Sequence, residues 1–258
     1  RYPNTSDTAP VPGIPGVGET SAGYDPYSYS DGFEVPLGSY PNTLTPWGLL
    51  DATGAQIARA PTVVLANAGD ALRLAGAAGW PVQPVRGQVS FAPAGGLLLP
   101  RLPVAGSGYV LPCVAGQAVF GATAQPGDAD AGVRLDDHRE NLEKLARLLG
   151  DGAAMDPVTL QGRTGWRWTA NDRLPLIGAV PDVHAGGVGS ADQPRLLPRQ
   201  EGLFVFAALG SRGIGSSVLG ARLLAAWVTG APAPVAASLM DAVDPARFAA
   251  RSRRRGLR

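Results

Sequence analysis

The feature that most constrains the fold is the stretch from residue 202 to residue 230, in which an apolar run, a glycine-rich loop and an apolar segment follow one another. Residues 203–208 are continuously apolar over the length of one strand, which is typical of a strand buried on both faces. Gly210, Gly213 and Gly215 then allow a sharp turn and a close approach of the backbone to another group. The next segment is helical in character and ends at Gly230, a residue suited to end a helix. The stretch predicts a strand, a tight loop and a helix.

The loop of this unit has the chemistry of a binding site for an anion or an electron-rich ring. A helix that begins there offers unpaired N–H groups and the positive end of its dipole, about half a charge. Arg212 adds a cation, which is unfavourable beside those groups unless an anion is shared between them. The glycines alone are equally compatible with plain close packing of a helix on a strand.

A second unit of the same type is predicted near the start of the ordered chain. Residues 62–66 are an apolar strand, and a loop at 67–70 leads into a short helix at 71–78. Before them, segments 47–51 and 56–60 flank a turn and predict a hairpin. Two strand–loop–helix units favour an α/β sheet.

From residue 82 the pattern changes to that of an antiparallel sheet, with short strands separated by glycine and proline. The predicted strands cover residues 87–92, 97–101, 109–112, 117–123 and 158–169. One helix at 135–149 interrupts them and ends at Gly150, with an apolar stripe of leucines. We expect His138 on the polar surface of this helix, where it has no special role.

Charge and composition exclude several classes of protein. The chain has 258 residues, 45% of them hydrophobic, and a formal net charge of +1, so no overall field favours nucleic acid. The basic cluster in the tail (Arg251, Arg253, Arg254, Arg255 and Arg258) is predicted to be a solvated end, with contact to RNA as the alternative. Cys113 is the single cysteine, which excludes a disulfide within the chain and a cysteine-based metal site.

The remaining segments predict no metal, no membrane and a cytoplasmic protein. Residues 1–45 are rich in Pro, Gly, Ser and Tyr and are expected to form an irregular leader. No run resembles a signal peptide or reaches membrane-spanning length. His184 has no matching acid and nucleophile, so a Ser-His-Asp site is not expected.

Four motifs together resemble a known family. They are VRGQVS at 85–90, GYVLP at 108–112 with VFGAT at 119–123, GWRWTANDRLPLIG at 165–178 and LGSRGI at 209–214. In combination they are similar to the FAD-dependent oxidoreductases of the glycine oxidase, sarcosine oxidase and D-amino-acid oxidase superfamily. The phrases at 172–181, 208–213 and 241–248 resemble, within it, the oxidase domain of the bifunctional proteins that make 5-methylaminomethyl-2-thiouridine in tRNA. The resemblance covers residues 47–248.

The resemblance implies an α+β fold, in which an incomplete Rossmann-like α/β FAD-binding part is joined to an antiparallel β-sheet substrate domain. The domains expected from it are an irregular leader at 1–45, a partial FAD-binding domain at 46–80 and 200–248, a substrate domain at 81–199 and a basic tail at 249–258.

The resemblance also implies a reaction. FAD would accept a hydride from a glycine-like secondary amine, here the carboxymethylaminomethyl group on the wobble uridine of tRNA, and the carboxymethyl group would be removed. The implied partners are tRNA and a methyltransferase domain or protein that acts next. Two alternatives stay open: a non-catalytic remnant or tRNA-binding fragment without flavin, and a small amino-acid oxidase of the glycine or sarcosine type.

The implied site combines two arginines and a tyrosine. Arg167 would grip the substrate carboxylate, Arg212 would assist beside the flavin, and Tyr109 would donate its hydroxyl. The residues alone also allow a guanidinium stacked between tryptophans and a core tyrosine. The implied cofactor contacts are Gly210, Ser211, Arg212, Gly213, Ile214, Gly215, Ala66, Asn67 and Gly69. The last three also fit an ordinary strand-to-helix loop, and Asp172 is expected to shape the turn before Pro175.

One part of the family's pattern does not occur in this sequence. The strand, GxGxxG loop and helix that hold the pyrophosphate of the dinucleotide are not found, and GIPGVG at 13–18 follows no strand. We therefore expect weaker binding of FAD, an unpaired sheet edge and exposed apolar surface.

Overall fold

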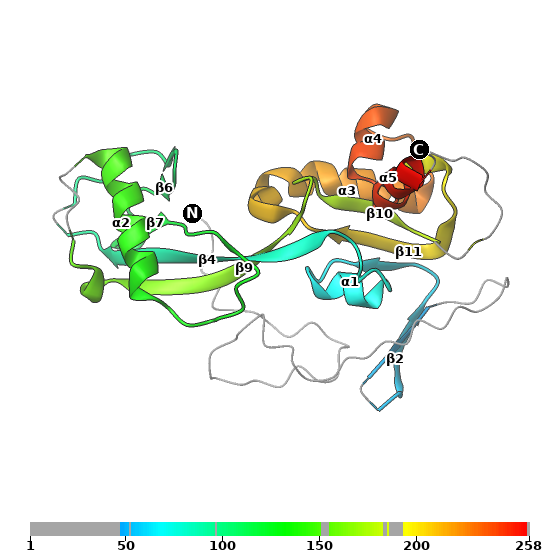
Figure 1. Cartoon of the computed structure of the whole chain (residues 1–258), viewed down its shortest axis with the longest axis horizontal. Helices are drawn as coiled ribbons and strands as arrows, with labels where there is room; N and C mark the ends of the chain where they lie inside the picture. The colour runs from blue at the N-terminus through cyan, green and yellow to red at the C-terminus, as the bar shows by residue number, and fades with distance from the viewer. Residues whose placement is uncertain are drawn as a thin grey trace.

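The computed structural model describes residues 47–51, 53–95, 97–150, 155–182, 185 and 193–256. The predicted leader at 1–45 and His184 lie outside these residues. The described chain forms two lobes joined by a long pair of strands (Figure 1). This arrangement agrees with the expected α+β class.

The first lobe is built on a three-stranded sheet with the order β10-β11-β3. Strand β11 (Arg199–Ala207) runs antiparallel to β10 (Leu176–Pro181) and parallel to β3 (Val63–Leu65). Leu203 and Val205 have no exposed surface, which confirms the buried strand predicted there. The parallel pair confirms that β3 and β11 belong to one α/β sheet.

The domain boundary predicted at residue 199 differs from the observed one. Strand β10 pairs with β11 and all its residues are buried, so residues 176–181 belong to the sheet of the first lobe. The domain bounds expected from the resemblance assign these residues to the substrate domain at 81–199. The sequence does not predict this assignment, because the apolar pattern of a strand buried on both faces does not indicate which strand it pairs with.

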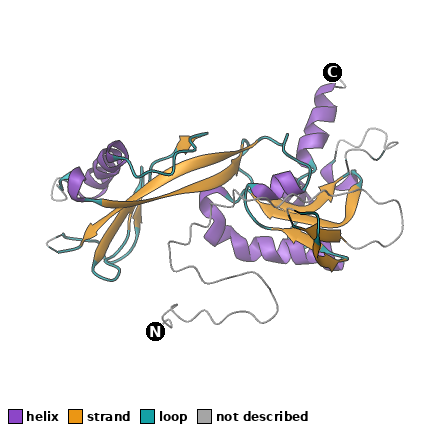
Figure 2. Cartoon of the chain, turned by 90° about the horizontal axis from the view of Figure 1, so that it is seen from below, coloured by secondary structure: helices purple, strands orange, loops and turns teal. Residues whose placement is uncertain are grey.

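Helices cover both faces of this sheet. Side chains of α1 (Asp70–Leu74) pack with Leu176 and Leu203 in one core, while α3 (Gly213–Thr229) lies on the opposite face (Figures 1 and 2). The close approach of α3 depends on Gly220, where a Cβ atom would lie 2.6 Å from the Phe206 ring. Gly230 ends α3 with φ 71°, as predicted.

The second lobe is a six-stranded sheet with the order β5-β6-β7-β4-β8, in which β9 also pairs with β4. The strands are β4 (Val82–Pro93), β5 (Val104–Ala105), β6 (Tyr109–Val110), β7 (Gln117–Gly121), β8 (Gln125–Pro126) and β9 (Gln161–Ala170). The strand predicted at 97–101 is not formed, and Leu98 there is 95% exposed. A short helical turn, η2 (Pro157–Thr159), delays the start of the predicted strand 158–169 to Gln161.

Helix α2 (Leu135–Leu149) covers one face of the second sheet and has the bounds predicted from the sequence. Its leucines pack with Val110 and Phe120 in a second core. The expected surface position of His138 is wrong, because the side chain is only 3% exposed and its Nδ1 lies 2.7 Å from the hydroxyl of Ser90.

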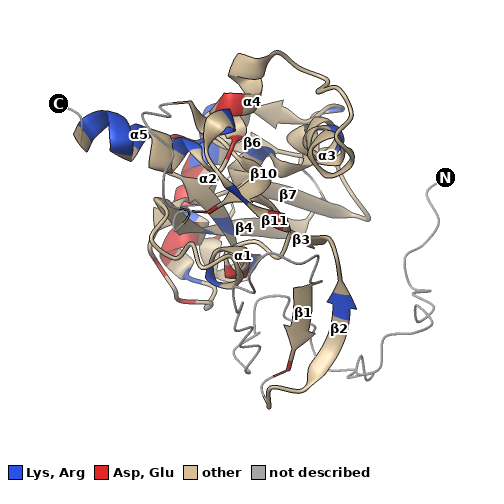
Figure 3. Cartoon of the chain, turned by 90° about the vertical axis from the view of Figure 1, so that its right-hand side faces the viewer, with Lys and Arg blue, Asp and Glu red and all other residues tan. Residues whose placement is uncertain are grey.

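The C-terminal segment is more ordered than the predicted basic tail at 249–258. Three short helices lie at this end of the fold: η3 (Pro194–Leu196), α4 (Ala237–Val243) and α5 (Arg247–Gly256). Helix α5 is rich in arginine near the C-terminus (Figure 3). Arg247 at its start is 2% exposed and its guanidinium bonds both carboxylate oxygens of Asp172, at 2.8 and 3.0 Å. The helix is therefore anchored to the first lobe.

Strand β3 forms one of the two edges of the first sheet. The hairpin of β1 (Trp47–Leu50) and β2 (Gln56–Ala60) stands beside it, as predicted for residues 47–60. An apolar pocket between hairpin and sheet is lined by Trp47, Val63, Leu74 and Leu203 among others. Among the described strands β3 has a partner on one side only, and Val64 is 41% exposed. The expected unpaired edge and exposed apolar surface are thus observed. None of the helices in the described ranges is long and apolar enough to cross a membrane.

Candidate functional site

The candidate site lies on the face of the second sheet that is opposite to α2. Arg167 on β9 pairs with Val85 on β4, and Tyr109 on β6 pairs with Gly121, which in turn pairs with Val89 on β4. Paired residues share a face of a sheet, and so do residues two apart along a strand. The register therefore places Arg167 and Tyr109 on the same face.

Arg167 is half-buried and is held by the main chain. Its Nη2 donates a hydrogen bond of 2.7 Å to the carbonyl oxygen of Thr123. The tryptophans beside it have other contacts: the indole N–H of Trp166 donates to the carbonyl of Asp128 at 2.7 Å, and Trp168 packs on Gly69. Both tryptophans thus also contact other parts of the protein.

Tyr109 is subject to the positive charge of Arg167. Burial raises the pKa of Tyr109 above its ordinary value of 10.0, and the positive charge of Arg167 opposes this shift. The phenol therefore stays protonated at neutral pH. It is available as a hydrogen-bond donor beside the guanidinium.

The glycine-rich loop meets the end of the strand that carries Arg167. A β-bridge joins Leu209 to Thr169, and a Cβ atom on Gly210 would lie 3.3 Å from the Thr169 hydroxyl. The loop forms a short turn, η4 (Gly210–Arg212), before α3 begins. Arg212 is exposed. The structure thus brings the loop of the first lobe beside the arginine strand of the second.

The start of α3 fits a flat, electron-rich group such as a flavin. No side chain caps this helix, so no side-chain acceptor bonds the N–H groups of its first turn. Gly215 leaves open space around its Cα, with nothing within 4 Å of a Cβ atom. Ile214 and Val218 are 96% and 72% exposed, which is unusual for large apolar side chains at a helix start. These features are the ones expected where a cofactor ring lies.

The second predicted group of cofactor contacts has a weaker basis. The amide of Asn67 donates to the carboxylate of Asp70 at 3.3 Å, and Ala66 and Asn67 are exposed. Gly69 is covered by Trp168, because a Cβ atom there would lie 2.5 Å from the indole Cδ2. The packing of Trp168 is thus a sufficient reason for glycine at this position, without a cofactor contact.

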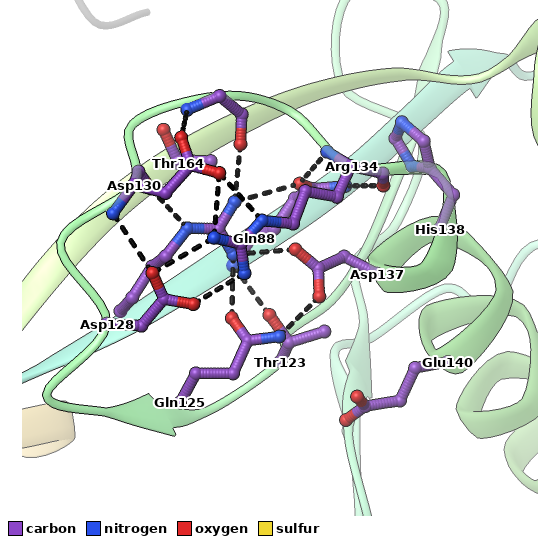
Figure 4. Close-up of polar contacts among 12 residues, drawn as sticks. Gln88, Thr123, Gln125, Asp128, Asp130, Arg134, Asp137, His138, Glu140 and Thr164 are labelled. Carbon is purple, nitrogen blue, oxygen red and sulfur yellow. Dashed lines mark hydrogen bonds and ion pairs between the residues drawn. The ribbon is translucent and has the colours of Figure 1, made fainter.

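A buried polar network supports the sheet from its other face (Figure 4). Arg86 and Asp137 form an ion pair of 2.6 Å at its centre, and Arg86 also donates to the side chain of Gln125. Gln88 bonds the main chain of Arg134 through both ends of its amide. No cluster of metal-ligating side chains occurs in the part of the chain that the structure describes. The network is a scaffold of hydrogen bonds.

Two residues of this region had no role in the predicted site. Gly87 and Thr123 lie in the motifs at 85–90 and 119–123, but only the register of β4 with β9 shows that both contact Arg167. Asp172 behaves partly as predicted: it accepts from the N–H of Leu174 in the turn before Pro175, and it also pairs with Arg247 and Arg251.

An α/β sheet with a glycine-rich loop is joined to an antiparallel sheet that carries a half-buried arginine, an arrangement that fits the class of flavin-dependent amine oxidoreductases. Residues 42–227 match the family described as "DAO: FAD dependent oxidoreductase". The chain belongs to this family.

Relatives agree with this assignment. The protein named tRNA 5-methylaminomethyl-2-thiouridine biosynthesis bifunctional protein MnmC of Methylibium petroleiphilum is 51% identical over 217 residues, which are 79% of this chain and 33% of that protein. Its counterpart in Burkholderia cenocepacia is 47% identical over 215 residues, 81% of this chain and 33% of that protein. The chain thus spans about a third of the length of these relatives.

A solved structure supports the fold. The glycine oxidase of Geobacillus kaustophilus is 26% identical, with a TM-score of 0.57 over 74% of this chain and 46% of that one. The expected fold class is thereby confirmed.

Proposed function

We propose that this chain binds FAD and oxidises a glycine-like secondary amine, and that its substrate is the carboxymethylaminomethyl group on the wobble uridine of tRNA. The observation that carries the proposal is the placement of Arg167 and Tyr109 on one sheet face, at whose end the glycine-rich loop lies. The identity of 51% to a MnmC protein supports tRNA as the substrate.

Arg167 binds the carboxylate of the substrate. Its planar fork can donate two parallel hydrogen bonds to the two carboxylate oxygens, which fixes the direction of the amine as well as its position. Tyr109 donates its hydroxyl to the same carboxylate. Because burial keeps the phenol protonated, this donor is present throughout the neutral range.

The loop and the start of α3 hold the flavin end of FAD. FAD supplies, when bound, the hydride acceptor that converts the amine to an imine, which water splits into a primary amine and glyoxylate. Arg212 and the N–H groups of the first turn favour negative charge beside them. The proposed contacts are Gly210, Ser211, Arg212, Gly213, Ile214 and Gly215, with Ala66, Asn67 and Gly69 toward the adenosine half.

The product indicates the neighbouring steps. Removal of the carboxymethyl group leaves a primary amine on the uridine, which a methyltransferase domain or protein can methylate. A tRNA-modifying enzyme of this kind acts in the cytoplasm.

The first test is the visible absorbance of the purified protein with and without added FAD, followed by a peroxide assay with N-methylglycine. The proposal predicts a bound flavin and peroxide formation. In Arg167→Leu turnover should be lost, whereas Arg163→Leu, an exposed arginine on the same strand, should keep it. A colourless protein that ignores FAD would support the flavin-free remnant instead.

A second candidate function is oxidation of free small amines. The similarity to a glycine oxidase at 26% identity favours it. The two candidates differ in their preference: a tRNA enzyme uses modified tRNA at far lower concentrations than glycine or N-methylglycine, and a small-amine oxidase does not act on tRNA.

A further inference from the structure

The guanidinium of Arg167 has one hydrogen-bond partner among the described residues. Its Nη2 donates to the Thr123 carbonyl at 2.7 Å, and the described residues contain no other hydrogen bond or ion pair of this side chain. A guanidinium has five N–H donors. One edge of the group is thus tied to the main chain, and the remaining donors are left for a ligand.

Gly87 lies directly beneath this contact. A Cβ atom at Gly87 would overlap Arg167 Nη2 and would lie 3.1 Å from its Cζ and 2.9 Å from the Thr123 carbonyl oxygen. Side chains pack no closer than van der Waals contact, so any residue larger than glycine must displace the guanidinium. The hydrogen bond from Arg167 to Thr123 therefore requires glycine at position 87.

The Thr123 carbonyl is itself held rigidly. Thr123 has no exposed surface, its N–H donates to the carbonyl of Gln88 at 3.1 Å, and its hydroxyl oxygen accepts from the N–H of Gln88 at 2.9 Å. The preceding carbonyl, that of Ala122, accepts from Lys144 Nζ at 2.7 Å. Lys144 also pairs with Glu140 one turn earlier on α2, at 2.6 Å. Helix α2 and strand β4 together fix the segment.

We propose that Gly87, Thr123 and Lys144 are positioning residues for the carboxylate site: Gly87 opens the space in which Arg167 lies, and the Thr123 carbonyl, clamped through Lys144, sets the direction of its guanidinium. This inference rests on the proposed role of Arg167 in binding the substrate. A long arginine side chain loses rotamer entropy when it binds a ligand. Because the hydrogen bond to Thr123 already restricts the Arg167 side chain before the substrate binds, less entropy is lost on binding and the affinity for the carboxylate is higher.

The buried polar network on the α2 side of the sheet is connected to the Thr123 segment. Asn141 on α2 donates to the same Gln88 carbonyl that accepts from Thr123, at 2.9 Å. Gln88 in turn bonds the main chain at the start of α2. The polar groups on this face of the sheet thus hold β4, α2 and the 121–123 segment in fixed positions. The partner of Arg167, the Thr123 carbonyl, lies in that segment.

The test is a set of three variants and one control, each assayed for N-methylglycine oxidation in the FAD-loaded protein. Gly87→Ala is expected to raise KM by about tenfold or more, with kcat changed by less than about threefold, because the carboxylate contact serves substrate and transition state alike. Lys144→Met should raise KM by a smaller factor, and Lys144→Arg should restore it. Gly79→Ala is the matched control, since a Cβ atom there meets nothing within 4 Å.

A crystal structure of Gly87→Ala gives an independent readout. We expect the Arg167 guanidinium to leave the Thr123 carbonyl while the rest of the sheet is unchanged. An unmoved guanidinium, or a KM equal to that of Gly79→Ala, would overturn the inference. If the unsubstituted protein oxidises no glycine-type amine, the proposed function fails, and the crystal structure alone then decides whether Gly87 positions Arg167.

Discussion

Arg86 and Asp137 form an ion pair of 2.6 Å whose side chains are 0% and 3% exposed. Asp136, which precedes Asp137 on α2, forms a similarly short pair of 2.5 Å with Arg139, and these side chains are 88% and 57% exposed. The two pairs differ in burial and hardly in distance. They therefore allow a direct test of how burial changes the contribution of an ion pair to stability.

Asp137→Ala is predicted to lower the free energy of unfolding by about 3–5 kcal/mol, because it leaves the Arg86 guanidinium buried without a counter-charge. Asp136→Ala, the exposed control, is predicted to change it by less than about 1 kcal/mol. Urea unfolding of both variants measures the difference. Equal losses would contradict the central position of Arg86 in the scaffold.

Tyr109→Phe tests the second donor of the site. Loss of a hydrogen bond to a charged group is worth about 1.5–3 kcal/mol, so kcat/KM for N-methylglycine should fall by about tenfold to a hundredfold. Since burial raises the pKa of Tyr109, the unsubstituted protein should show no loss of activity from this group below pH 10.0. A variant with unchanged kcat/KM would remove Tyr109 from the site.

The contribution to stability of the ion pairs that join α5 to Asp172 should depend on pH. Burial disfavours the Asp172 carboxylate, but the hydrogen bonds from Arg247 and Arg251 outweigh it and hold its pKa at about 2. A folded-state pKa below the ordinary 3.8 means that the stabilisation is complete above pH 3.8 and is lost as the pH falls toward about 2. Asp172→Asn should thus be less stable than the unsubstituted protein at neutral pH, and the gap should close with acid. Unfolding curves at several pH values measure the gap, and a constant gap would be the contrary result.

His138 should make the second lobe acid-sensitive at a higher pH. Burial lowers its pKa below the ordinary 6.5, and the nearby Asp137 only partly opposes this shift. The unfolded chain therefore binds a proton more readily than the folded one, so stability should fall as the pH drops below 6.5. His138→Gln should reduce this dependence. Urea midpoints between pH 7 and pH 5.5 compare the two proteins, and an identical pH dependence would count against the buried neutral imidazole.

Local signals in the sequence predicted much of the fold. The bounds of α2, the glycine end of α3 and the hairpin of β1 and β2 follow from caps, periodicity and turn residues. The predicted strand at 97–101 failed because an apolar run without a pairing partner does not form a strand. The assignment of β10 failed because its partner lies beyond a long connection.

Buried polar residues were harder to predict. His138 lies seven residues before Leu145, on the apolar stripe of α2, and this spacing was a usable sign of burial. Arg86, Gln88 and Ser90 alternate along β4 as polar residues do on a solvated face, yet all three are fully buried. Only the partners on α2 and in the loop at 125–134 explain them, and those partners are distant in sequence.

In the candidate site, too, some residues could be predicted from local motifs and others only from long-range pairing. Arg167 and Arg212 stood out through their motifs, but Gly87 and Thr123 acquire a role only when the register of β4 with β9 and the fold of the 121–123 segment are known. A glycine whose missing side chain makes room for an arginine 80 positions later leaves no local trace.

The most direct test of the account is nucleoside analysis by mass spectrometry of tRNA that carries carboxymethylaminomethyl-uridine, after incubation with the FAD-loaded protein and with its Arg167→Leu variant. The account predicts that the unsubstituted protein converts the nucleoside to the aminomethyl form with release of glyoxylate, and that the variant does not. Unchanged nucleoside in both reactions, or equal conversion by both, would contradict it.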